Sequence, residues 1–259
     1  MKRIGNEVFK IIRKLVEIFY IKIELIGNEN LKDEPLIIVG NHCQIHGPIA
    51  CELYLPENCY TWCAGEMMKL KEVPPYAYKD FWSQKPKLTR PFYRLLSYLI
   101  APLSVLIFNN ARTIPVYRDM RIISTFKSTI KKLSEGKSVV IFPECNEKNN
   151  NILYKFQENF IEIAKLYHKK TGKEISFVPL YIAPNLKKMY LGKPTVFRHD
   201  SPISEEKKRI CEYITQQITE IAQSLPIHTV VPYRNISKRL YPLNKNTEVD
   251  TNEKADSRL

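Results

Sequence analysis

Three short runs of consecutive apolar residues constrain the fold of this chain most strongly. They span 36–39, 138–142 and 176–182, are rich in β-branched residues, and are separated by segments with helical spacing. A strand that is apolar at successive positions is buried on both faces, which is typical of parallel sheets covered by helices. The chain is therefore predicted to be α/β, a single domain with a mostly parallel or mixed sheet. Within the third run, Pro179 predicts an edge strand or a bulge.

The segments between these runs repeat apolar residues at helical spacing. A length of 259 residues suits one large domain of this class. Residues 56–91 are rich in proline and aromatic residues and are predicted to form an irregular surface excursion. Helices are expected at 48–55, 120–135, 156–168 and 204–224, and two further short strands at 22–26 and 113–117.

Both ends of the chain are expected to lie outside the main domain. Residues 1–22 predict an amphipathic helix with a basic side, which either packs on the domain or lies in an anionic membrane interface. Residues 23–234 form the expected domain, and the polar tail 235–259 is expected to be disordered. The apolar run 95–108 is shorter than the roughly 20 residues that span a bilayer, so it is either a core helix or a membrane-dipping segment.

The net charge of +13 and the isoelectric point near 9.3 indicate a polyanionic partner. Candidates are an anionic lipid surface, an acidic carrier protein, a phosphorylated substrate and nucleic acid. The sequence has neither zinc-finger spacing nor an RNA-binding sheet motif, so no nucleic acid is expected. The six cysteines lack a paired Cys-x-x-Cys spacing and are expected to be reduced thiols. Cys43, His46 and Cys51 near His42 lack a second ligand pair, so no metal is expected.

His42 is the leading candidate for a reactive group. It follows the run 36–39 after Gly40, which can turn the chain, and Asn41, which can cap a helix. In an open α/β sheet, ligands bind at the carboxyl ends of the strands, and a histidine there can act as a general base. The alternative is that His42 only packs or caps.

Four segments stand in a characteristic order along the chain. They are GNHCQIHGP at 40–48, IPVYR at 114–118, VVIFPE at 139–144 and FVPLYI at 177–182. In this order they resemble the glycerolphosphate and lysophosphatidate acyltransferase family. The resemblance implies a peripheral or monotopic enzyme on the cytoplasmic face of the membrane. It would transfer a fatty acyl group from acyl-CoA or acyl carrier protein to a hydroxyl of a lysophospholipid or glycerol-phosphate-like acceptor, in phospholipid biosynthesis, without a further cofactor.

The resemblance also assigns roles to individual residues. It makes His42 the general base, and it makes Arg118 the group that binds the phosphate of the acceptor, because a guanidinium matches phosphate geometry. Glu144 would belong to the acceptor site, and Arg112 or Arg121 would add positive charge. Asn41, Phe142 and Pro143 match the family motifs without a chemical role of their own.

The sequence departs from the family pattern where an aspartate should orient His42. The fifth residue after His42 is Gly47, and Cys145, Asn146 and Glu147 replace the end of the third motif. Gln44 and His46 are possible orienting groups. These departures favour two alternatives: a catalytically weakened protein of the same fold that binds lipid or phosphate ligands, or a transferase with another acceptor. Gly47→Asp is expected to raise activity if the helix geometry still aims that position at His42 and the φ/ψ angles of Gly47 admit a side chain.

Overall fold

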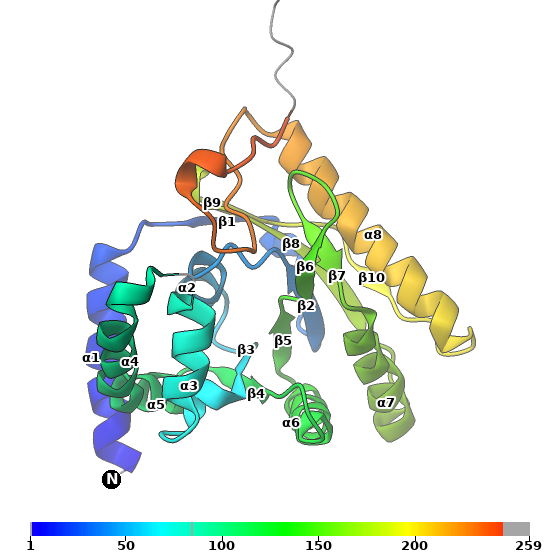
Figure 1. Ribbon diagram of the computed structural model, residues 1–259. Coiled ribbons are helices and arrows are strands. Elements are labelled where there is room, and N and C mark those ends of the chain that lie inside the picture. The colour runs from blue at the N-terminus through cyan, green and yellow to red at the C-terminus, as the bar shows by residue number, and fades with distance from the viewer. Residues whose placement is uncertain (1, 84, 246–259) are drawn as a thin grey trace, which may run out of the picture.

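The computed structural model describes residues 2–83 and 85–245 of the chain. Its centre is an eight-stranded sheet flanked by helices (Figure 1). Along the sheet, the strands follow the order β1 (Glu24–Ile26), β9 (Lys188–Leu191), β8 (Ser176–Ala183), β2 (Leu36–Gly40), β5 (Ser138–Ile141), β3 (Cys59–Ala64) and β4 (Thr113–Val116), with β10 (Thr195–Val196) paired to β8. A separate hairpin joins β6 (Glu144–Lys148) to β7 (Tyr154–Phe156).

The five strands from β8 to β4 run parallel, whereas β9 and β10 run antiparallel to β8. The mixed sheet of an α/β domain is therefore confirmed. Because β2, β4, β5 and β8 are parallel, their carboxyl ends lie at one edge of the sheet, where the predicted site residues follow them.

Helices cover both faces of the sheet, as the continuous apolar strands require. Alternate residues of β2 belong to different layers: Ile37 and Val39 pack in the layer of α8, whereas Ile38 packs in the layer of α2. The helices are α1 (Lys2–Phe19), α2 (His46–Tyr54), α3 (Val73–Ala77), α4 (Arg90–Leu99), α5 (Ala101–Asn110), α6 (Ile122–Ser134), α7 (Glu162–Thr171) and α8 (Ile203–Ser224).

Pro179 lies inside the sheet rather than on an edge strand. On one side, β8 pairs with β2 along its length, and Pro179 stands opposite Val39. On the other side, the partner changes from β10, at Phe177, to β9, at Leu180. Pro179 falls at this change of partner, where its missing N–H leaves no gap in a ladder.

Residues 56–91 are less irregular than the composition predicted. The segment begins with β3, which lies between β5 and β4 in the sheet. It continues through α3, where Val73 and Ala77 pack with Ala101 of α5 in a third small core. The prolines do not prevent regular structure here, because Pro74 and Pro75 lie in the first turn of α3 and Pro91 lies in the first turn of α4.

The apolar run 95–108 forms parts of two helices. α4 and α5 meet at Ile100, with Pro102 in the first turn of α5. Among the described residues, no single helix is long and apolar enough to cross a bilayer, but the pair 87–99 and 101–110, bent by 44°, meets the length and composition needed.

Residues 235–245, expected to belong to a disordered tail, are folded against the domain. An isolated bridge joins Thr229 to Leu243, and the buried side chain of Asn244 hydrogen-bonds to the end of α8. We call the loop 228–244 the C-terminal strap. The strap is held by hydrogen bonds and by the buried side chains of Val230 and Val231, and the polar composition of 235–259 did not predict its contacts. The remainder of the predicted tail, 246–259, lies outside the described residues.

Candidate functional site

A tight turn at the end of β2 projects His42 from the sheet. The two residues that follow it, Cys43 and Gln44, have φ angles of 49° and 55°, which side chains rarely adopt. Asn41 fixes the turn, since its Oδ1 accepts the backbone N–H of Ile182 at 2.7 Å and its Nδ2 donates to the Ile182 carbonyl at 3.0 Å. Asn41 thus joins the ends of β2 and β8, instead of capping α2.

Glu144 holds the same turn from the side of β5. Its Oε1 accepts the backbone N–H of His42 at 2.7 Å, and its Oε2 accepts that of Tyr154 at 2.8 Å. The side chain is only 4% exposed. Burial raises the pKa of Glu144 to about 7, although both N–H groups favour the carboxylate. The structure therefore places Glu144 under the backbone of His42, where it connects the turn to the β6–β7 hairpin.

The imidazole of His42 lies among aromatic rings. It meets Phe142 edge-on at 5.2 Å and Tyr233 edge-on at 5.8 Å between ring centroids. Its Nδ1 is buried and has no hydrogen-bond partner among the described residues. Burial lowers the pKa of His42 to about 4, so the ring is neutral at pH 7. A neutral imidazole can accept a proton, but within the described part of the chain no carboxylate bonds to Nδ1 and fixes the tautomer.

Neither predicted orienting group reaches that ring nitrogen. Gln44 donates to the carbonyl of Arg234 at 3.1 Å and to the hydroxyl of Tyr241 at 3.0 Å. The Nδ1 of His46 lies 2.9 Å from the hydroxyl of Tyr20. The prediction that one of them orients His42 is thus not met in this structure, since the positive φ of Gln44 and the start of α2 direct both side chains elsewhere.

Gly47 is a glycine because the backbone of the turn passes too close for a side chain. Its N–H donates to the His42 carbonyl at 3.1 Å. A Cβ at this position would lie 2.3 Å from that carbonyl oxygen and 3.2 Å from Cζ of Phe142. The expectation that Gly47→Asp raises activity is therefore wrong, because the aspartate would displace the turn that carries His42.

Arg118 follows β4 at the same edge of the sheet and is exposed. Burial raises the pKa of Tyr233, and the nearby charge of Arg118 opposes that rise, so the Tyr233 hydroxyl and the Arg118 guanidinium are neighbours. Burial and the charge of Asp80 raise the pKa of Tyr76 to about 12, and the charge of Arg118 opposes that rise as well, so Tyr76 and Asp80 also lie near Arg118. Tyr233 is thus a neighbour of both His42 and Arg118.

A family model described as Acyltransferase matches residues 83–183, which include Arg118 and the segment 142–144. Over these residues the chain is acyltransferase-like. The match supports acyl transfer as the general chemistry, and the turn of His42 lies outside it. A search of curated protein sequences finds no match. Among solved structures, one similar chain is the 1-acyl-sn-glycerophosphate (LPA) acyltransferase PlsC from Thermotoga maritima, with 15% sequence identity, a TM-score of 0.46, and coverage of 85% of this chain and 79% of that one.

Arg112 is excluded from the acyltransferase-like site by its position. It precedes β4, whereas Arg118 follows it, and four residues of strand separate their ends by about 13 Å. The Arg112 guanidinium pairs with the carboxylate of Glu52 and donates to the Pro56 carbonyl at 2.8 Å. Arg112 therefore holds the loop after α2 at the opposite edge of the sheet, and its predicted role at the acceptor phosphate is wrong.

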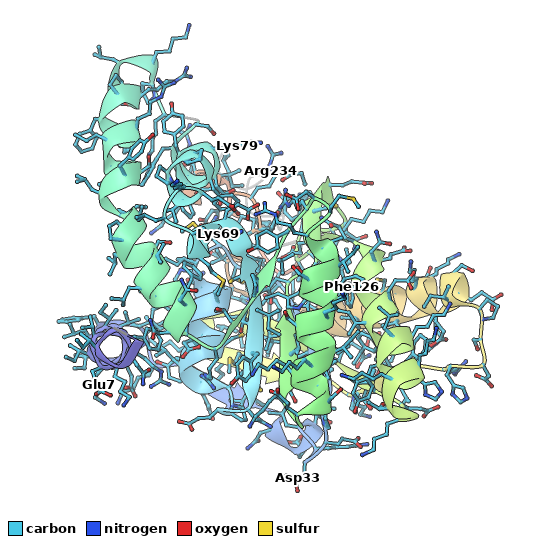
Figure 2. All side chains as sticks on the ribbon, turned by 90° about the horizontal axis from the view of Figure 1, so that it is seen from below. Glu7, Asp33, Lys69, Lys79, Phe126 and Arg234 are labelled. Carbon is cyan, nitrogen blue, oxygen red and sulfur yellow. The ribbon has the colours of Figure 1, made fainter. Side chains whose placement is uncertain are left out.

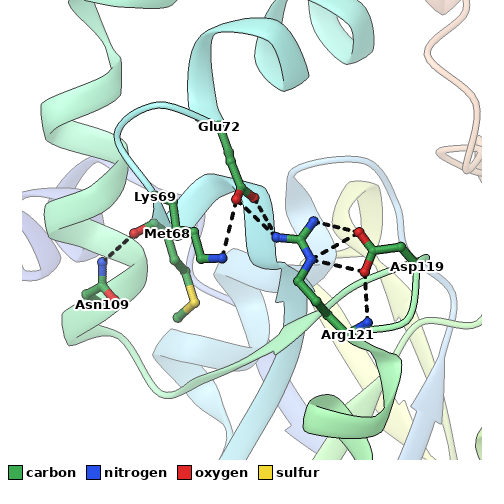
Figure 3. A network of polar contacts seen from close by, with 6 residues as sticks. All are labelled: Met68, Lys69, Glu72, Asn109, Asp119 and Arg121. Atoms are coloured by element: carbon green, nitrogen blue, oxygen red, sulfur yellow. Dashed lines mark hydrogen bonds and ion pairs between the residues drawn. The ribbon is translucent and has the colours of Figure 1, made fainter.

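Arg121 is part of a polar network beside the site (Figure 3). It contacts the carboxylates of Glu72, at 3.0 Å, and Asp119, at 2.8 Å, while Lys69 contacts Glu72 at 3.3 Å. The guanidinium of Arg121 also lies over the ring of Tyr117. The network connects the start of α3 to the loop that carries Arg118, so Arg121 supports that loop instead of adding uncompensated charge.

No pattern in the sequence predicted that Tyr233 or the strap that carries it would lie at the site. They lie more than a hundred residues beyond Arg118 in the sequence, and no motif marks them.

A surface hollow of about 780 Å³ lies away from the site, along α8 and the β6–β7 loop, and polar side chains such as Asn150 and Lys208 contribute to its lining. In the described part of the chain, no group of three His, Cys, Asp or Glu side chains could hold a metal ion.

Proposed function

We propose that this chain is an O-acyltransferase that moves a fatty acyl group from acyl-CoA or acyl carrier protein to a hydroxyl of a lysophospholipid or glycerol-phosphate-like acceptor. The observation that carries the proposal is that a neutral histidine, His42, and a cationic side chain, Arg118, are both neighbours of Tyr233 at one edge of the sheet. The match of residues 83–183 to the acyltransferase family supports the general reaction.

In the proposed reaction, His42 removes the proton of the acceptor hydroxyl as its oxygen attacks the thioester carbonyl. The tetrahedral intermediate then collapses to the ester and expels the thiolate, which takes the proton back from His42. The products are an acylated acceptor and a free thiol, so the ring ends in its initial neutral state. Because burial lowers its pKa to about 4, His42 is a weak base, and positioning must supply much of the rate.

Arg118 is proposed to bind the phosphate of the acceptor through bidentate hydrogen bonds. The net charge of +13 would attract the phosphates of coenzyme A or an acidic carrier protein.

The test is an assay of the purified protein with radiolabelled acyl-CoA or acyl carrier protein and a panel of lysophospholipids and glycerol 3-phosphate. His42→Ala is expected to lower kcat by on the order of 10²–10⁴, the range for general acid–base catalysis. His168→Ala is the matched control, because His168 is a half-buried histidine on α7 whose ring stacks on that of His199, away from the site. Transfer by the His42 variant at the parent rate would overturn the mechanism.

A second function, binding of lipid or phosphate ligands without turnover, is favoured by one observation. The buried Nδ1 of His42 has no partner among the described residues, so no group fixes the tautomer that a strong base requires. In serine hydrolases, loss of the orienting aspartate costs on the order of 10⁴ in rate. Tight lysophospholipid binding by a parent protein that transfers no acyl group would favour this function over the first.

We further propose that the protein lies on the cytoplasmic face of a membrane through α1 and α4. These helices stand with α5 at one end of the molecule (Figures 1 and 2). Large apolar side chains on them are exposed, including Ile11 (62%), Phe19 (85%) and Leu95 (61%). Such a surface suits an interface between headgroups and acyl chains, where a lysophospholipid acceptor also lies.

Sedimentation with vesicles that contain phosphatidylglycerol tests this placement. The parent protein is expected to pellet, and salt is expected to release part of it, because surface attraction is screened over about 10 Å at 0.1 M. Ile11→Glu should weaken binding, whereas Val196→Glu, at an exposed position on β10, should not. Equal binding of both variants would exclude α1 from the interface.

A further inference from the structure

The C-terminal strap is anchored firmly at its base. The backbone N–H of Val230 donates to the Pro242 carbonyl at 2.8 Å, and that of Asn244 donates to the His228 carbonyl at 3.1 Å. The buried side chain of Asn244 accepts the N–H of His228 at 2.9 Å and donates to the Ala222 carbonyl at 2.7 Å. The tip of the strap is therefore presented from a fixed base at the end of α8.

The tip lies against the turn that carries His42. Gln44 donates to the Arg234 carbonyl at 3.1 Å and exchanges hydrogen bonds with the Tyr241 hydroxyl. These contacts join the residue two positions after His42 to both arms of the strap. Gln44, predicted from the sequence to orient the imidazole, instead fixes the strap beside it.

Between these two attachments, Tyr233 points into the site. Its ring meets the His42 ring at an interplanar angle of 89° and lies 5.7 Å from the ring of Tyr154. The charge of Arg118 acts on the Tyr233 hydroxyl, so the guanidinium is its neighbour. One half-buried side chain thus contacts the ring of the proposed base and lies next to the cationic group.

The sheet alone does not bring these two groups together. His42 follows β2 and Arg118 follows β4, and β5 and β3 lie between those strands. Three steps of about 4.8 Å between neighbouring strands separate them by about 14 Å. Tyr233, which comes from outside the sheet, is a neighbour of both groups and therefore lies between them across this distance.

We propose that Tyr233 is a positioning residue that sets this spacing for the acceptor. Its ring fixes the imidazole of His42, and its hydroxyl holds the guanidinium of Arg118 toward the phosphate. This inference rests on the function proposed above. It assigns to the strap the orienting role that no carboxylate fills among the described residues around His42.

The two contacts of Tyr233 can be separated by substitution. Tyr233→Phe removes only the hydroxyl and is expected to raise the KM for 1-acylglycerol 3-phosphate about tenfold, the scale of a hydrogen bond to a charged group, with kcat within about twofold. Tyr233→Ala also removes the ring and is expected to lower kcat by a further factor of about ten or more. Tyr213→Phe is the matched control, because Tyr213 on α8 donates to the Lys193 carbonyl and is remote from the site.

A second readout does not depend on turnover. In a pH titration of the imidazole by NMR, Tyr233→Ala should raise the pKa of His42 toward 6.5, because the ring becomes solvated, whereas Tyr233→Phe should leave it unchanged. The neighbouring titratable group that bonds to the turn, Glu144, is present in both variants. If the parent transfers no acyl group, the proposed function fails, and this titration still decides the role of the ring.

The outcomes divide clearly. A raised KM in Tyr233→Phe together with a raised His42 pKa in Tyr233→Ala supports the positioning role. An unchanged KM in Tyr233→Phe overturns the contact with Arg118, and an unchanged titration in Tyr233→Ala overturns the contact with His42. If the alanine variant does not fold, Tyr233→Leu, which keeps an apolar side chain without the ring, takes its place in both measurements.

Discussion

Replacing Glu144 with glutamine should change how the stability of the protein depends on pH. The carboxyl group is buried, and its pKa rises from its usual 4.5 to about 7. The native state therefore holds a proton that the unfolded state has lost between these two pH values. By linkage, Glu144 contributes stability that is complete below about pH 4.5 and lost as the pH rises through 7. The difference of 2.5 pKa units corresponds to about 3 kcal/mol.

His42 contributes with the opposite sign over nearly the same range. Its pKa falls from 6.5 to about 4 in the native state, so its contribution to stability is present above pH 6.5 and lost as the pH falls toward 4. In the parent protein the two contributions offset each other between pH 4.5 and 6.5. Glu144→Gln removes one of them, so the stability of the variant should rise with pH across this range.

The glutamine amide also has only one acceptor oxygen for the two N–H groups that Glu144 satisfies, those of His42 and Tyr154. Losing one hydrogen bond costs on the order of 1 kcal/mol. The variant should therefore be less stable than the parent at pH 4.5 and equally or more stable at pH 7.5.

Urea unfolding followed by circular dichroism, repeated every half pH unit from pH 4 to pH 8, measures the free energy of unfolding of the parent and of the variant as a function of pH. Subtracting the parent from the variant cancels every other titrating group and isolates Glu144. Glu57→Gln is the matched control, because Glu57 is exposed, and its difference curve should be flat. A flat difference curve for Glu144→Gln as well would refute the burial argument for this carboxyl group.

Three further predictions concern the site. Arg118→Ala should lower kcat/KM for a phosphorylated acceptor by an amount equivalent to about 1.5–3 kcal/mol. Arg198→Ala, at an exposed position near β10, should leave kcat/KM unchanged. Equal kinetics in the two variants would remove Arg118 from the site. Gly47→Ala should lower the free energy of unfolding in urea by about 1–3 kcal/mol, because its Cβ meets the His42 carbonyl. Gly5→Ala on α1, where a Cβ has room, should not lower it. Since the pKa of His42 is about 4, kcat/KM should not fall through protonation of His42 between pH 7 and pH 5. A fall in kcat/KM with an apparent pKa near 6.5 would contradict this prediction if it persists in Glu144→Gln. It would show that the imidazole is solvated.

The sequence by itself determined the class of the fold and the location of the site. The apolar runs that form β2, β5 and β8 have to be buried on both faces, which requires a sheet between helices. Because the residues after parallel strands gather at one edge of the sheet, His42 could be predicted as a site residue from local pattern, and the family resemblance added Arg118 and Glu144.

The tertiary structure decided the contacts that local pattern does not encode. The role of Gly47 depends on a carbonyl five residues away, and that of Arg112 depends on which end of β4 it occupies. The place of Tyr233 depends on a strap whose base is closed by hydrogen bonds and by buried Val230 and Val231. The contacts of Arg112 with Glu52 and of Tyr233 with His42 join segments far apart in the chain, so only the folded backbone brings these partners within reach.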